Sequence, residues 1–250
     1  MFTWVGFLMH ECWHGYVPNI PSKKFYNIFA YMLFTDPQIY RIVHAYHHGM
    51  VHSWEDPEFH PLGYIKNDNW RRIYNFLEVF LGIAFLFVVA AFIVPNHPKH
   101  KVQYKIQKTI TAILVLGFFI GGLVIVSHFL FGVPFLTIAF SYAITIWINS
   151  VVLHHSQLVE HGNLIVNGNF PQRNAWTHNL SDKGLLEKLF LFFTHGDSRE
   201  HVLHHVLTSV YSRPFAHKVP MPSNAVYITI KDYLDIIKRM LQGKVDIIDP

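Results

Sequence analysis

The sequence predicts an all-α integral membrane protein, and three observations support this fold class. Hydrophobic residues occupy 51% of the 250 positions and charged residues only 14%, whereas a soluble domain usually has about 25% charged residues. Apolar stretches long enough to cross a bilayer as helices occur in the middle of the chain. Histidine occurs 19 times, almost as often as lysine and arginine together, and it forms clusters outside those stretches.

Two of the apolar stretches, 109–130 and 135–153, predict a transmembrane hairpin. Each has roughly 20 residues, the number that a helix needs to cross ~30 Å of hydrocarbon. The uncharged sequence FGVP, 131–134, joins them and is typical of a turn. We therefore expect the chain to cross the membrane and return within these residues.

A third apolar stretch, 74–94, is expected to be interfacial or re-entrant. Basic residues mark the cytoplasmic side of a membrane protein, and they flank this stretch at both ends: Arg71, Arg72, Lys99, Lys101, Lys105 and Lys108. A single crossing helix is the alternative. It would place residues 74 and 94 at opposite faces of the membrane, whereas our expectation places both on the side of the histidine clusters.

Charge and cysteine content narrow the class of function. The net charge of +4 indicates basic cytoplasmic loops before it indicates nucleic acid. No basic run interleaved with aromatic residues occurs, so we expect no nucleic-acid partner. Cys12 is the only cysteine, which excludes an intrachain disulfide and a cysteine-based zinc site.

Three histidine clusters share a helical spacing. HECWH has histidines at i and i+4, and HAYHH and HVLHH each have them at i, i+3 and i+4. Residues at these spacings lie on one face of a helix, and imidazole binds iron, copper, nickel and zinc. The clusters therefore predict a metal site that is built from three parts of the chain: His10, His14, His44, His47, His48, His201, His204 and His205.

His52 also lies beside the second cluster, in RIVHAYHHGMVH, and spacing alone would allow it to join. It is i+4 from His48 but falls outside the H-x-x-H-H pattern, which is repeated at 201–205. We therefore expect His52 not to bind metal.

The ordered set H-x-x-x-H, H-x-x-H-H and H-x-x-H-H, with a transmembrane hairpin between the second and third clusters, resembles the membrane fatty acid desaturase and hydroxylase superfamily. The resemblance extends from His10 to His205. It implies a single domain, 1–250, in which a cytosolic helical cap holds a di-iron site. Family members usually carry a helical hairpin ahead of the first cluster, and we expect this chain to lack it.

The resemblance also implies a ninth ligand between the hairpin and the third cluster. His161 matches that position, in SQLVEHGN, which is similar to the N-x-x-E-H-x-G motif of membrane alkane hydroxylases. Gln157 stands where that motif has asparagine. In related desaturases an amide at this place touches the metal site through water, and Gln157 could do the same because i and i+4 share a helix face.

Carboxylates near the clusters could orient the ligands, since a metal-bound imidazole usually donates its other N–H to a carboxylate or carbonyl. Glu160 and Asp197 are candidates, and each could equally be a solvated loop charge. The remaining carboxylates near the clusters are Glu11, Asp56, Glu58 and Glu200.

The activity that the resemblance implies is attack on an unactivated C–H bond of a lipid chain, with two iron ions as cofactor and O2 as co-substrate. A desaturase would introduce a double bond into a fatty acyl chain. A hydroxylase or ketolase of the same superfamily, acting on an alkane, acyl chain or carotenoid, is the alternative. Both reactions would use the same ligands, so the choice stays open.

Electrons would come from a separate redox protein of the ferredoxin, rubredoxin or cytochrome b5 type, because the chain has no G-x-G-x-x-G or P-loop pattern. Lys99 to Lys108, Arg199 and Arg213 could attract an acidic donor or could be basic loops. We expect an integral membrane protein of the bacterial inner membrane or ER membrane, with its histidine clusters on the cytoplasmic side.

A non-catalytic metal or haem membrane protein is the third hypothesis. Haem carriers place single histidines inside the span, and transporters place ionisable residues at mid-membrane. Only His128 lies inside an apolar stretch here, which counts against both classes.

Overall fold

The computed structural model is mostly helical, and it describes residues 2–15, 22–32, 37–93, 117, 121–194, 196–207 and 219–250. Its helices in chain order are α1 (Phe2–His14), α2 (Ser22–Met32), α3 (Pro37–Met50), α4 (Asp68–Leu81), α5 (Ile83–Ile93), Gly121–Phe131, α7 (Phe135–His161), α8 (Phe170–Ala175), α9 (Leu185–Phe193), the 3-10 helix η2 (Asp197–Arg199), α10 (His201–Val206) and α12 (Ile230–Leu241). The strands pair in parallel, β1 (Leu164–Val166) with β4 (Asp246–Ile248) and β2 (His178–Leu180) with β3 (Val226–Ile228).

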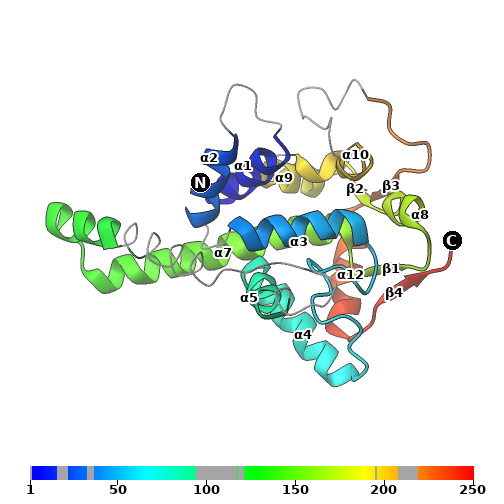
Figure 1. Ribbon diagram of the computed structural model, residues 1–250, viewed down its shortest axis with the longest axis horizontal. Coiled ribbons are helices and arrows are strands. Elements are labelled where there is room, and N and C mark those ends of the chain that lie inside the picture. Colours follow the sequence, from blue (N-terminus) through cyan, green and yellow to red (C-terminus); the bar gives the residue numbers. More distant parts are fainter. Residues whose placement is uncertain are drawn as a thin grey trace.

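Helix α7 runs lengthwise through the molecule (Figure 1). Its first residues are apolar and exposed, and its last residue is His161. Among the described residues it is the one helix that is long and apolar enough to cross a membrane. It ends at Gly162, whose φ of 61° lies in the left-handed region that favours glycine. The helix predicted at 135–153 therefore forms and continues to His161.

The predicted partner of this helix, 109–130, is described only at residue 117 and from 121 onward. The apolar helix Gly121–Phe131 lies at the far end of α7 from the other elements (Figure 1). The described part is thus helical as expected, while the crossing of the membrane by a hairpin stays a prediction.

The apolar stretch 74–94 forms two helices, α4 and α5, and not one continuous crossing helix. Gly82 separates them with a φ of 69°. The hydroxyl of Ser150 on α7 fastens the break, because it donates to the Leu81 carbonyl at 2.6 Å and accepts from the Ala84 amide at 2.7 Å. A Cβ on Gly82 would lie 2.3 Å from the Ser150 carbonyl oxygen, so a side chain does not fit there. Residue 94 lies outside the described residues, so an interfacial or re-entrant position stays a prediction.

The second half of α7 is packed into the main core. Leu158 and Val159 are fully buried there, against strands β2 and β3 and the amphipathic helix α12. His154 contacts the Glu78 carboxylate at 3.1 Å, and His155 donates to the Val79 carbonyl at 2.9 Å. These two histidines therefore attach α7 to α4.

A second core holds the first part of the chain together. Met9 and Cys12 of α1 are buried against Tyr26 and Ala30 of α2 and Tyr40 of α3. This packing brings the helices that carry the first two histidine clusters side by side.

Candidate metal centre

All nine histidines that the sequence singles out lie together, at the meeting point of α1, α3, α7 and α10. Two groups of ring nitrogens are close enough to hold a metal ion. We call the group from α1, α3 and α10 the outer cluster: His10, His14, His44 and His204. We call the group from α3, α7 and α10 the inner cluster: His47, His161 and His205.

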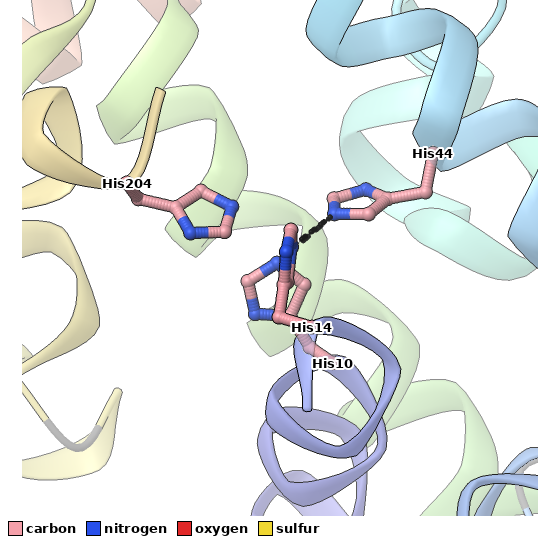
Figure 2. A group of neighbouring side chains, drawn as sticks. All are labelled: His10, His14, His44 and His204. Atoms are coloured by element: carbon pink, nitrogen blue, oxygen red, sulfur yellow. Dashed lines mark hydrogen bonds between the residues drawn. The ribbon is translucent and has the colours of Figure 1, made fainter. Parts of the chain in front are cut away.

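The outer cluster is directed at one point. Figure 2 shows its rings turned toward a common centre, with His10 and His14 side by side on α1. The Nε2 atoms of His10 and His14 each lie 3.1 Å from Nε2 of His44. His204 approaches from α10, and its ring centroid is 4.6 Å from that of His10. The two rings from α1 are half-buried, and the other two are buried.

The inner cluster is buried throughout. The ring centroid of His161 is 4.6 Å from that of His47 and 4.8 Å from that of His205. His201 adds to this cluster, with its Nε2 atom 3.1 Å from Nε2 of His161. Glu160 completes a third candidate metal group with these two histidines.

His48 lies between the two clusters. Its Nε2 atom is 3.2 Å from Nε2 of His44 in the outer cluster. Its ring centroid is 4.7 Å from that of His204 and 4.6 Å from that of His205. Because α3 and α10 each contribute to both clusters, the two groups form one continuous centre.

The third histidine motif is on a short helix, α10, that neighbouring polar groups hold in place. The buried side chain of Asn179 on β2 accepts from the Val202 amide at 3.1 Å. Ser198 in η2 donates to the Glu160 carboxylate at 2.8 Å. These contacts tie the third motif to β2 and α7, and so to the main core.

Two carboxylates from the turn after α3 hold rings of the second motif. Nδ1 of His44 is 3.1 Å from Glu58, and Nδ1 of His47 is 2.8 Å from Asp56. All four side chains are buried. The outer nitrogens are therefore occupied by acceptors, which leaves the Nε2 atoms free to face the centre.

Sequence reasoning favoured other carboxylates for this role. Glu160 contacts Nε2 of His201 at 3.4 Å and so lies on the ligand side of that ring. The side chain of Asp197 lies outside the described part of the structure. The carboxylates that contact His44 and His47 are Glu58 and Asp56. The sequence signal that could have identified them is the acidic D-P-E turn, Asp56 to Glu58, which follows the second motif within ten residues.

Burial keeps most of these rings neutral. It lowers the pKa of His44 and of His205, and neighbouring histidines lower both further. At His47 burial also opposes protonation, but the carboxylates of Asp56 and Glu58 outweigh it and raise the pKa. Neutral imidazole with a lone pair is the form that binds a metal ion.

The donor set and its spacing fit transition-metal ions. Imidazole nitrogen binds such ions at about 2.1 Å, so two ligands at right angles lie about 3 Å apart. The Nε2–Nε2 distances to His44 and His161 match this value. Both ring nitrogens of the buried His205 have no hydrogen-bond partner among the described residues, and a metal ion would supply one.

The side chain of Gln157 contacts a carboxylate of the centre. Its amide donates to Glu58 at 2.6 Å, while its carbonyl oxygen is buried with no partner in the described part of the chain. Gln157 therefore orients the carboxylate that holds His44. Its expected contact with metal through water stays a prediction.

A cavity of about 50 Å³ joins the clusters to apolar side chains. Its polar wall includes His10, His44, His47, His161 and His201, and its apolar wall includes Gly6, Phe7, Met9, Ile83 and Leu153. The apolar wall is tight, because a Cβ on Gly6 would lie 2.6 Å from Leu153. A short apolar group fits between this wall and the imidazoles.

His52 is buried beside the inner cluster but belongs to none of the candidate metal groups. Its Nδ1 atom donates to the carbonyl of Arg173 at 2.8 Å. Burial, the largest cause, lowers its pKa to about 3. That His52 does not bind metal stays a prediction, and its buried ring is available for a supporting contact.

Comparison with known proteins agrees with this geometry. The family model described as Fatty acid desaturase matches residues 1–217. No curated protein and no solved structure gives a significant match. The match covers every histidine of the centre and most of the chain. The chain therefore belongs to the fatty acid desaturase family, whose members are membrane-associated oxidoreductases of the desaturase and hydroxylase superfamily.

Proposed function

We propose that this protein is an O2-dependent di-iron lipid desaturase that introduces a double bond into a fatty acyl chain. The observation that carries the proposal is the convergence of nine imidazoles on two adjoining clusters, next to a cavity with an apolar wall. Imidazole binds iron as well as copper, nickel and zinc, and the family, which is known for di-iron sites, favours iron. The family supports oxidation as the reaction class.

The outer cluster would hold one iron ion and the inner cluster, with His201, the other. His48 lies within reach of either. The bound iron ions would activate O2 and so supply the oxidant for a C–H bond. The ligands would be His10, His14, His44, His47, His48, His161, His201, His204 and His205.

The residues of the chain itself would position substrate and exclude water. Gly6, Ile83 and Leu153 would hold a methylene segment against the imidazoles, since apolar contact fixes an alkyl chain and a few polar groups orient the reaction. Asp56 and Glu58 would keep the ligand rings from rotating. Removal of two hydrogens from neighbouring carbons of that segment gives the alkene.

A hydroxylase is the second candidate, and one sequence observation favours it. SQLVEHGN around His161 is similar to the motif of membrane alkane hydroxylases, with Gln157 in place of asparagine. The same ligands and cavity would serve, and oxygen transfer to the held carbon would give an alcohol. A ketolase would repeat that oxidation on the same carbon.

Electron donor and membrane side are further parts of the proposal. A ferredoxin, rubredoxin or cytochrome b5 type protein would dock on the cytoplasmic side, where the clusters would lie. Lys99 to Lys108 and Arg213 fall outside the described residues. Arg199 forms an ion pair with Asp182 at 3.0 Å on the surface. This pair reduces the attraction that Arg199 would exert on an acidic electron donor.

Metal analysis of the purified protein, followed by lipid analysis of an expressing host, tests this function. About two iron ions per chain and a new double bond support the desaturase. A new alcohol would move the assignment to the hydroxylase. Zinc alone with no oxidised product, or a haem spectrum, would contradict the enzyme and support a non-catalytic metal or haem protein.

A further inference from the structure

The outer nitrogen of His161, Nδ1, lacks the carboxylate partner that His44 and His47 have. It is buried, and no described residue hydrogen-bonds to it. Nδ1 of His48 is likewise buried without a hydrogen-bond partner among the described residues. A buried N–H without an acceptor is destabilising, so an acceptor is expected close by.

An acceptor without a partner among the described residues lies beside His161, on His52. Its ring centroid lies 5.5 Å from that of His161. The carbonyl of Arg173 takes the hydrogen of its Nδ1 atom at 2.8 Å, so the neutral ring carries its lone pair on Nε2. That Nε2 atom is also buried without a partner among the described residues.

The two unused atoms are complementary. His161 directs Nε2 at the inner cluster, 3.1 Å from Nε2 of His201. A neutral His161 that binds metal through Nε2 must carry its hydrogen on Nδ1. His161 therefore offers a donor where the neighbouring His52 offers an acceptor.

The backbone holds His52 in place for this contact. Its φ of 56° is the one positive value at a non-glycine residue in the described chain, and such conformations persist where surrounding contacts impose them. The carbonyl of His52 accepts from the Val166 amide at 2.9 Å. Arg173, whose carbonyl holds the ring, reaches back to the Gly49 carbonyl at 3.1 Å.

We propose that His52 is a positioning residue for His161, accepting the Nδ1–H of that ligand directly or through one water. This inference rests on the proposed iron site. It deepens that site by making the inner cluster depend on a tenth histidine, outside the H-x-x-H-H motif. A neutral acceptor would orient His161 without adding a negative charge beside the inner cluster.

Two variants separate the hydrogen bond from the backbone conformation. Glycine and asparagine both tolerate a positive φ, so neither His52→Gly nor His52→Asn strains the turn. Only asparagine retains an acceptor. His60→Asn is the matched control, because His60 follows in the same turn region and its ring contacts Trp54, away from the candidate metal groups.

The readouts are iron content, the rate of iron loss to a chelator, and the Mössbauer spectrum of 57Fe-loaded protein. We expect His52→Gly to lose inner-cluster iron at least tenfold faster, as other outer partners of metal ligands do. Only one of the two iron signals should change. His52→Asn should recover most of the retention, and His60→Asn should match the unchanged protein.

Equal iron retention in His52→Gly and the unchanged protein would overturn the inference while leaving the proposed function intact. Equal losses in His52→Gly and His52→Asn would also overturn it, because the effect would then not follow the acceptor. An unchanged protein that binds no iron would overturn the proposed function and this inference together.

Discussion

The outer and inner clusters use the same residue type in different surroundings. The inner cluster is buried throughout and rests on the core around Leu158 and Val159 of α7. The outer cluster depends on α1, whose rings are half-buried and which packs mainly on α2 and, through Gly6, on Leu153. Metal binding at the inner cluster is therefore coupled to folding of the main core around α7, whereas at the outer cluster it depends on the docking of one helix.

The largest effect is expected from His47→Ala in the inner cluster. The change removes an inner ligand and leaves the buried carboxylate of Asp56 without its ring partner. We expect loss of both iron ions and activity lower by roughly 1000-fold or more. The free energy of unfolding should fall by about 1–3 kcal/mol. Metal analysis and denaturant unfolding of the metal-free protein measure this. Retention of two irons would contradict the assignment of His47.

The outer counterpart, His14→Ala, sharpens the comparison. His14 is half-buried, and its helix α1 packs mainly on α2. We expect loss of one iron and of activity, with the free energy of unfolding of the metal-free protein changed by less than about 1 kcal/mol. Mössbauer spectra of 57Fe-loaded protein would show which signal disappears. A stability loss as large as that of His47→Ala would remove the distinction between the clusters.

A smaller effect is expected when a ligand ring loses its charged partner. Asp56→Asn keeps the shape of the side chain that contacts His47 but removes its charge, so activity and iron affinity should fall about 10–100-fold. Glu55→Gln, an exposed neighbour, is the matched control and should change neither. Steady-state turnover and chelator competition provide the values. Equal behaviour of the two variants would show that the carboxylate is not needed.

The smallest effect on iron content is expected from Gly6→Val. Gly6 is part of the cavity wall. The new side chain would collide with Leu153 and narrow the apolar end of the cavity. We expect iron content to stay unchanged while turnover of the preferred substrate falls about tenfold and product distribution shifts. Gly49→Ala, whose Cβ meets nothing within 4 Å, should leave both unchanged. Unaltered products from Gly6→Val would mean that the substrate does not use this cavity.

The sequence predicted which histidines lie together better than it predicted the carboxylates that contact them. The i, i+3 and i+4 spacings identify which face of α3 carries His44, His47 and His48, because helix geometry is local. Asp56 and Glu58 are on a turn, and spacing gives no information about where a turn directs its side chains. His161 was predicted from the family resemblance, because a single histidine forms no spacing pattern in the sequence.

The helix ends show the same limit. Hydropathy ends the apolar helix near residue 153, yet α7 continues to His161 because its last turns bury polar residues within the main core. The apolar stretch 74–94 also includes Gly82 without a polar interruption beside it, although the helix breaks there between α4 and α5. The break depends on Ser150, which is distant in sequence, so no local pattern could reveal it.

The central claim is that the two clusters hold two iron ions through imidazole nitrogen. Iron per chain, measured on the full-length protein purified from membranes of an iron-supplied host, tests it most directly. We predict about two irons per chain in the unchanged protein and at most one in His161→Ala. Fewer than one iron per chain in the unchanged protein, or two irons retained in His161→Ala, would contradict the claim.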